Sequence, residues 1–255
     1  LGFIRGGLSS ADKLFYYNGS TTVVTSRLFR DMSSWFHIVF SVNSGTGVIY
    51  LNGSSILTGI SGASLSTGTH QTRVSRSSGF FDGYLAETHL VTGSALTPSS
   101  FGETKNDIWV AKNYTGSHGD DGFKLTYADS SSLGDDTSGE NHDLTVTNLD
   151  ATDQMLDSPT NNFAVMDALS LSTSGATLDE GNLKWSIGGA DGVGKSNFVM
   201  TSGKWYCEVG VGGDVSDYIG VASGNATLFD VNGTSTVLYN GSDGSLEVDG
   251  TTVPG

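Results

Sequence analysis

Eight consecutive residues, 189–196 with the sequence GADGVGKS, match the G-x-x-x-x-G-K-S pattern of loops that bind phosphate groups. Such a loop joins a strand to a helix, because the backbone N–H groups at the helix start point at the phosphates. The preceding LKWSI can form the strand, but the following NFVMTSGKWYCEV alternates like a strand and contains Gly203. We therefore interpret the match as a β-loop and predict no nucleotide binding at Lys195.

A second candidate for chemistry is the trio Asp82, Glu87 and His89 in the stretch SGFFDGYLAETHLV. Glycan hydrolysis needs two carboxyl groups about 5 to 10 Å apart on either side of the scissile bond. Along a continuous strand, residues five apart face opposite sides, whereas Glu87 and His89 share a face. Asp82 precedes Gly83 and suits a turn. The trio is therefore predicted to belong to the scaffold, and no catalytic residue is expected.

Acidic side chains are dense in the segment DSSSLGDDTSGENHD, which could hold a metal ion. Calcium takes six to eight oxygen ligands, and loops rich in Asp and Asn supply them. The spacing does not fit an EF-hand, so solvated Asx turns are the alternative. No other cofactor is expected. The candidate ligands are Asp135, Asp136, Glu140 and Asp143.

The composition excludes several classes of partner. The chain has 12 Lys and Arg against 27 Asp and Glu, a net charge of −15, and phosphate backbones are bound by clustered cations. Nucleic acid is therefore excluded as a partner, and an anionic lipid surface is disfavoured. No apolar run is long enough for membrane insertion. The one cysteine, Cys207, cannot form an intramolecular disulfide and is expected to pack as a small core residue.

Short β-branched and aromatic runs between Gly, Ser, Asn and Asp predict an all-β protein. The clearest signal is WFHIVFSVNSGTGVIYLNG, in which strands 35–42 and 47–52 form a hairpin. Asn52 and Gly53 then supply a type I′ turn. The stretches HQTRVSRSS and FFDGYLAETHLV predict another strand pair, which Pro98 ends.

This hairpin is similar to the W-h-H-h-h-x-x-V…h-Y-h-N-G pattern of the laminin-G and concanavalin A-like family. FDGYLAETHL with ALTP resembles a later element of the same family. The resemblance implies an antiparallel jelly-roll sandwich over residues 1–103 that lacks N-terminal strands. LDEGNLKWSI, SGKWYCEVGVGG and DYIGVASGNA resemble the first half of a SPRY-type sandwich over residues 171–255. Two tandem, incomplete sandwiches are thus expected, and with them a fragment of a longer protein.

The intervening residues 104–170 form an Asp/Asn-rich connector whose string DQMLDSPTNNFA resembles phage virion proteins. The resemblance implies a non-enzymatic tail fibre or appendage protein, in the virion or extracellular, with lectin-like modules for host-surface attachment or virion structure. The implied partners are a host-surface glycan, other virion subunits and further copies of the chain, a trimer being common in fibres. The alternative is an extracellular glycan-active enzyme or its carbohydrate-binding accessory module.

Aromatic side chains are the usual platform for a bound sugar. Trp35, Trp185 and Trp205 lie in strand patterns and are expected in cores. Trp109 and Tyr114 lie in a polar segment, where exposure is easier. These two residues are therefore the predicted glycan contacts.

Overall fold

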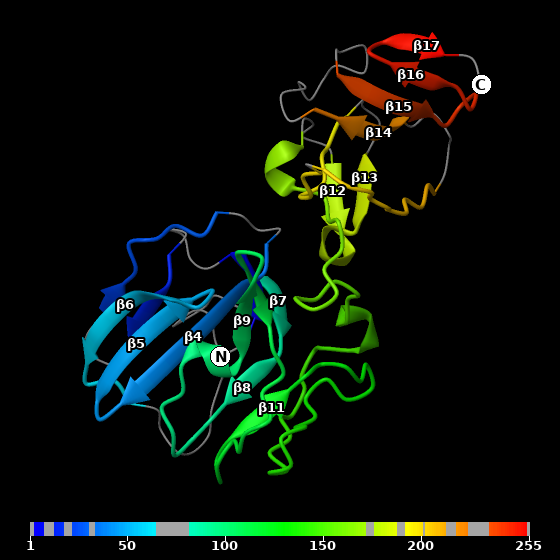
Figure 1. Ribbon diagram of the computed structural model, residues 1–255. Coiled ribbons are helices and arrows are strands. Elements are labelled where there is room, and N and C mark those ends of the chain that lie inside the picture. The colour runs from blue at the N-terminus through cyan, green and yellow to red at the C-terminus, as the bar shows by residue number, and fades with distance from the viewer. Residues whose placement is uncertain are drawn as a thin grey trace. The chain divides into compact units, whose positions relative to one another are not determined.

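The computed structural model shows an all-β protein (Figure 1). The described part of the chain contains no α-helix and four short 3-10 turns, at Pro98–Ser100, Ala151–Asp153, Ala168–Ser170 and Glu180–Asn182. No helical segment among these described residues is long and apolar enough to cross a membrane. The structure describes residues 3–7, 13–17, 22–30, 34–64, 82–171, 176–187, 192–200, 202–212, 218–223 and 235–253.

The chain divides into two compact units, Leu1–Phe163 and Ala164–Gly255. The domain boundaries at residues 103 and 170 stay a prediction. Most of the predicted connector belongs to unit 1, because β11 within it pairs with β8. The strands of unit 1 are β1 Phe3–Gly7, β2 Phe15–Tyr17, β3 Thr22–Val24, β4 Phe36–Asn43, β5 Thr46–Leu51, β6 Ser54–Ser61, β7 Asp82–Ala86, β8 Thr88–Leu90, β9 Gly102–Lys105, β10 Ile108–Ala111 and β11 Phe123–Leu125.

Unit 1 is organised around an antiparallel sheet in the order β6-β5-β4-β1-β7. The predicted hairpin is confirmed, since β4 pairs with β5 in a register that runs from Ile38↔Leu51 to Asn43↔Thr46. The predicted turn at Asn52 and Gly53 is also present, with φ of 45° and 83°, and it leads into β6. The predicted strand at 70–78 lies outside the described residues.

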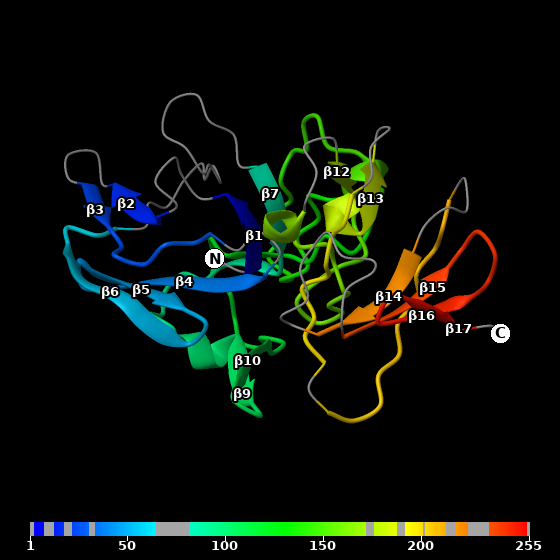
Figure 2. The ribbon, with the colours of Figure 1, turned by 90° about the horizontal axis from the view of Figure 1, so that it is seen from above.

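Strand β4 is buried on both faces. Its even-numbered residues, Phe36 and Ile38 among them, pack with Phe29, Ile49 and Leu51 in the hydrophobic core. The odd-numbered residues point to the opposite face, because strand side chains alternate. Figure 2 shows the β2–β3 hairpin on one side of this sheet and the β9–β10 hairpin on the other. The second face therefore receives polar residues from β9–β10 and the following loop.

Unit 2 contains two separate sheets, the hairpin β12-β13 and the sheet β14-β15-β16-β17. Their strands are β12 Ala176–Asp179, β13 Lys184–Ile187, β14 Tyr218–Ala222, β15 Thr236–Asn240, β16 Leu246–Val248 and β17 Thr251–Val253. The expectation of buried Cys207 and Trp205 is wrong, because Cys207 is exposed and Trp205 is 53% exposed. Residues 202–212 form no strand, so no sheet buries the apolar side chains of their alternating pattern.

Candidate functional site

The polar face of β4 centres on His37, which is 1% exposed. The side-chain oxygen of Asn52 accepts the backbone N–H of His37 at 2.8 Å, and the backbone N–H of Asn52 donates to the carbonyl of His37 at 2.9 Å. The turn that joins β5 to β6 therefore also fixes the position of His37. The imidazole Nδ1 accepts a hydrogen bond of 2.9 Å from Nε1 of Trp109.

Trp109 lies on β10 and stacks on His37, with ring centroids 5.7 Å apart and planes 15° apart. Two glycines make room for its indole. A Cβ atom at Gly53 or at Gly102 would lie 2.5 Å from Trp109 ring carbons. Trp109 is half-buried, and its N–H is used internally. Its packing on His37 is thus a structural role, and its predicted contact with glycan stays a prediction.

A Gly102→Ala variant tests this packing. Because a Cβ atom at Gly102 would overlap Trp109, we expect the free energy of unfolding of unit 1 to fall by about 2–3 kcal/mol. Hydrogen exchange of the β4 and β5 amides measures the loss. Gly210→Ala is the control, since a Cβ atom there meets nothing within 4 Å. Equal exchange in the two variants would contradict the steric account.

Glu87 interrupts the strand that the sequence predicts as continuous. Its φ of 51° separates β7 from β8, so strict alternation does not hold across residues 82–90. Glu87 and His89 nevertheless meet, as predicted for residues on one face, with Oε2 and Nε2 3.6 Å apart. Asp82 begins β7, and its side chain lies outside the described part of the chain.

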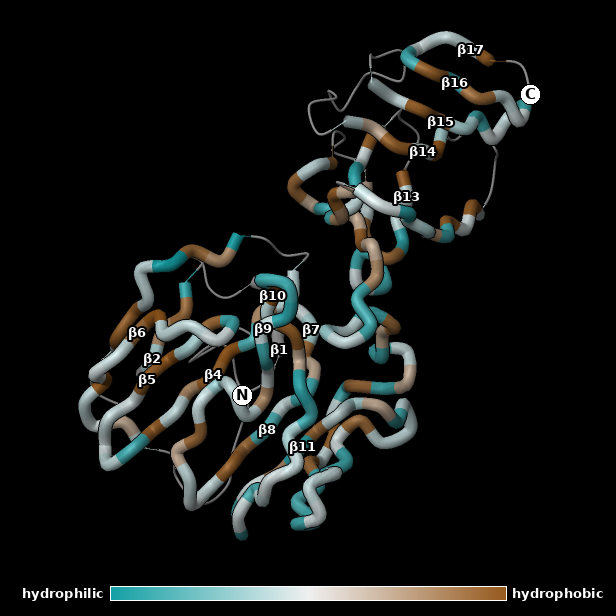
Figure 3. The backbone as a smooth tube through the Cα atoms, in the orientation of Figure 1, coloured by the Kyte–Doolittle hydropathy of each residue, from teal (hydrophilic) through white to brown (hydrophobic). Residues whose placement is uncertain are grey.

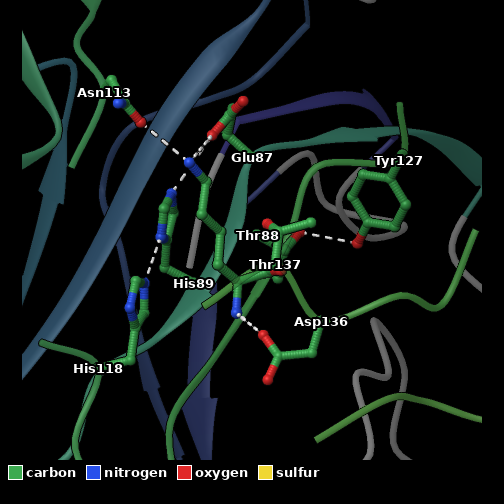
Figure 4. Close-up of polar contacts among 9 residues, drawn as sticks. Glu87, Thr88, His89, Asn113, His118, Tyr127, Asp136 and Thr137 are labelled. Atoms are coloured by element: carbon green, nitrogen blue, oxygen red, sulfur yellow. Dashed lines mark hydrogen bonds and ion pairs between the residues drawn. The ribbon is translucent and has the colours of Figure 1, made fainter. Parts of the chain in front are cut away.

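His89 connects Glu87 to a second histidine that the sequence analysis did not single out (Figure 4). Its Nδ1 lies 3.1 Å from Nε2 of His118, and the two rings are nearly parallel. The donor and acceptor of the histidine pair are set by the tautomers: in the tautomer of neutral His89 whose Nε2 proton faces the Glu87 carboxylate, Nδ1 accepts from Nε2–H of His118. The three side chains form one polar line, which we call the His118–His89–Glu87 line.

Lys124 on β11 reaches the acidic end of this line. Its Nζ lies 3.7 Å from Oε2 of Glu87 and donates to Oδ1 of Asn113 at 2.9 Å. The contact with His89 lowers the pKa of Glu87 most; burial opposes this, and Lys124 lowers the pKa further. Glu87 is therefore ionised at neutral pH and cannot act as a general acid there.

Burial lowers the pKa of all three histidines in this region. The pKa of His37 falls to about 4, mainly because desolvation penalises the imidazolium and also because His89 is near. Desolvation is also the largest cause for His89, partly opposed by Glu87. For His118, desolvation again comes first and His89 adds to it. At neutral pH the site therefore holds three neutral imidazoles.

A cavity of about 80 Å³ opens beside these groups. This volume suits a few water molecules or one small polar group, and a whole sugar ring would have to rest on its rim. Its lining combines imidazole, carboxylate, amide, ammonium and hydroxyl groups with an aromatic ring. The lining residues are His37, Glu87, His89, Phe101, Ala111, Lys112, Asn113 and Thr160.

Tyr114, the other predicted glycan contact, is half-buried next to this cavity. Its ring packs 4.9 Å from Phe101 and edge-on to His118 at 5.1 Å, between centroids. Its hydroxyl donates to the carbonyl of Ser117 at 2.8 Å. Tyr114 thus supports the loop that carries His118, and its contact with glycan stays a prediction.

The predicted calcium ligands do not converge. Asp136 is buried and accepts backbone N–H groups of Lys124, Ser138 and His142 at 2.8–2.9 Å. Asp143 accepts the backbone N–H of Asp136. These bonds match the Asx-turn alternative, and the described residues contain no group of three or more potential ligands that could hold a metal. Glu140 is half-buried and Asp135 is exposed. Calcium binding stays a prediction.

Lys195 lies in a described segment, 192–200, that contains no helix, so the phosphate-loop geometry is not formed there. Its backbone is paired instead, since its carbonyl accepts from Asp167 and its N–H donates to Oγ of Ser170. The interpretation of this stretch as a β-loop agrees with these contacts.

The string DQMLDSPTNNFA has a physical role that its spacing did not reveal. Asp157 is 2% exposed, and its carboxylate accepts Nε1–H of Trp35 at 2.9 Å and the backbone N–H of Phe163 at 2.8 Å. Ser158 and Asn161 then pair through both backbone groups, and the tight turn between them presents Thr160 to the cavity. The only hint in the sequence was the turn signal before Pro159.

No family model, no curated protein and no solved structure matches the chain. The functional argument therefore rests on the residues and their geometry.

Proposed function

We propose that the chain is a non-enzymatic component of a virion appendage whose unit 1 recognises host-surface glycan at the cavity beside His37. The observation that carries this proposal is the cavity lining. It offers an amide, an ammonium and a hydroxyl group from Asn113, Lys112 and Thr160, next to the ring of Phe101. Sugars are bound by such mixtures of hydrogen-bonding groups and an apolar surface.

The absence of catalysis is supported by the state of the ionisable groups. Glycosidases use two carboxyl groups, and Glu87 is the only carboxylate in the described lining of the cavity. It is already paired with His89 and Lys124. A glycan-active enzyme is the second candidate, and the observation that favours it is the His118–His89–Glu87 line, because a carboxylate also orients the histidine in hydrolase triads.

The proposal also includes a jelly-roll arrangement of the strands of unit 1. The confirmed hairpin and the antiparallel sheet β6-β5-β4-β1-β7 support a jelly-roll sandwich for unit 1, in keeping with the laminin-G resemblance.

Attachment through weak sites needs repetition on one particle, because multivalency raises the overall affinity. Association with further copies, with a trimer as the fibre form, and with other virion subunits therefore completes the proposal, together with a virion or extracellular location.

A glycan array with the assembled protein, beside a reducing-sugar assay on host polysaccharide, tests this function. We expect saturable binding without release of sugar. Thr160→Arg should fill the cavity mouth and weaken binding at least tenfold, about 1.4 kcal/mol. Thr58→Arg on β6 is the matched control, because Thr58 is exposed and is not part of the cavity lining. Steady release of oligosaccharide would favour the enzyme, and equal binding by both variants would remove the cavity from the proposal.

A further inference from the structure

An amine, a primary amide and a carboxylate meet at the end of the Lys124 side chain. Nζ of Lys124 donates to Oδ1 of Asn113 at 2.9 Å and lies 3.7 Å from Oε2 of Glu87. Figure 4 shows Asn113 and Glu87 at the same end of the polar cluster. Transfer of an amide needs these three groups: a nucleophilic nitrogen, a carbonyl carbon that bears a leaving nitrogen, and a group that moves the proton.

The backbone of Lys124 is held on both sides, so its side chain starts from a fixed point. Lys124 pairs with His89 across β11 and β8, its N–H donates to Oδ1 of Asp136, and its carbonyl accepts the backbone N–H of Thr137. Figure 3 shows hydrophobic residues on β8 and β11, which run side by side. The side chain of Lys124 is only 14% exposed. Because Glu87 contacts His89, this register brings the amine to the carboxylate.

The residues on either side of Asn113 hold it in place. The backbone N–H of Lys112 donates to the carbonyl of Phe101 at 2.9 Å, and the ring of Tyr114 packs on the ring of Phe101. The carboxamide of Asn113 thus meets Lys124 from an anchored segment after β10. Its carbonyl carbon lies about 1.2 Å from the oxygen that accepts the hydrogen bond. A small shift of the amine therefore brings it to about 3–3.5 Å from that carbon, the separation from which bonds form.

We propose that Lys124 and Asn113 join through an intramolecular amide bond, with Glu87 as the catalytic residue that moves the protons. The Glu87 carboxylate takes a proton from the Lys124 ammonium, and the electron pair of the neutral amine attacks Cγ of Asn113. The Nζ–Cγ bond forms and the Cγ–Nδ2 bond breaks. Glu87 passes its proton to the departing Nδ2, and a second proton from Nζ follows through the same carboxylate. The nitrogen leaves as ammonium, and Glu87 is ionised again.

The charge states of the resting site agree with this sequence of steps. Glu87 starts the reaction ionised, as its lowered pKa requires, and becomes an acid only after it has taken the proton from Lys124. Partial burial of the pair lowers the cost of the neutral amine and acid relative to the two charges. Asn113 is exposed, so the ammonium can leave into solvent and the product accumulates. Each chain reacts once, which agrees with a protein that is not an enzyme.

The bond ties the segment after β10 to β11 and closes the loop that carries His118. A covalent link across a short loop restricts the unfolded chain, as a disulfide does. The single cysteine of the chain leaves no intramolecular disulfide for this purpose. The proposal does not depend on glycan recognition by unit 1.

Mass spectrometry of the intact full chain tests the bond. The wild type should be lighter than its sequence requires by one ammonia, about 17 Da, and digestion should yield a peptide in which Asn113 and Lys124 are joined. Lys124→Arg keeps the cation but has no nucleophilic amine, because the guanidinium stays protonated, so it should have its full mass. Glu87→Gln cannot take the proton and should also have its full mass. Lys105→Arg is the matched control, since exposed Lys105 pairs with Glu103 at 2.9 Å, and it should stay linked.

The joined peptide decides the question in the wild type even where a variant does not fold, and circular dichroism of each variant identifies that case. A wild type of full mass after prolonged incubation would overturn the proposal. So would a loss of the same mass that Lys124→Arg retains, because an asparagine that cyclises on its own backbone also releases ammonia. Linkage that persists in Glu87→Gln would overturn the role of Glu87. Full mass in folded Lys124→Arg and Glu87→Gln, with Lys105→Arg still linked, would support the proposal.

Discussion

Asp136→Ala is expected to lower the free energy of unfolding of unit 1 by about 3–5 kcal/mol, because three backbone N–H groups lose their acceptor. These groups belong to Lys124, Ser138 and His142. Burial alone would raise the pKa of Asp136, but the three N–H groups and the Ser138 hydroxyl together outweigh it and lower the pKa to about 2. The bonds are therefore worth more than the desolvation that they oppose.

Chemical denaturation followed by hydrogen exchange of β11 and its neighbours measures this loss. The neighbouring Asp135→Ala is the matched control, because Asp135 is exposed and should change stability by less than about 0.5 kcal/mol. If both variants unfold at the same denaturant concentration, Asp136 does not hold this segment together. Calcium added to the wild type in the same assay also tests the predicted site: a shift of the midpoint that Asp135→Ala abolishes would establish binding.

Acid should weaken unit 1 well above the pH at which carboxylates titrate. The pKa of His37 is about 4 in the fold and about 6.5 when unfolded, so between these values the unfolded chain binds more protons. The contribution of neutral His37 is complete above about pH 6.5 and is lost as the pH falls toward 4. It amounts to about 3 kcal/mol. His89 and His118 act in the same direction, since burial lowers the pKa of each.

His37→Asn separates this effect from general acid unfolding. The side-chain oxygen of asparagine can replace Nδ1 as the acceptor for Trp109 but does not titrate, so stability should fall less between pH 6.5 and 4. His142→Asn is the control, because His142 is exposed and lies outside the cluster. Urea midpoints at several pH values measure the slope. A wild-type slope that His37→Asn does not reduce would contradict the assignment to this residue.

Local chemistry made part of this fold predictable from the sequence. The hairpin of β4 and β5 follows from alternation and from the turn residues between the strands. Asn52 and Gly53 both adopt positive φ, as their residue types favour. The pairing of Glu87 with His89 was also predictable from the sequence, because residues two apart on a strand share a face. The two side chains still meet although the strand breaks between β7 and β8.

The rest of the site depends on contacts that no local pattern encodes. His118 is 29 residues from His89, and only the folded loop brings their rings together. The positive φ of Glu87 was not predictable either, because glutamate rarely adopts it and the surrounding structure imposes it. For residues 202–212 the sequence predicted a strand that is not formed. An alternating pattern forms a strand only where a partner strand lies beside it.

The hydrogen bond from Trp35 to Asp157 has a consequence for synthesis on the ribosome. The two residues are 122 positions apart, and translation at about 5–20 residues per second separates their appearance by roughly 6 to 24 s. During that time the indole N–H next to β4 has no carboxylate to meet. The nascent unit 1 therefore lacks this long-range tie until the DSPTNNF turn has been synthesised, although the β9–β10 hairpin on the same side of the sheet is made earlier.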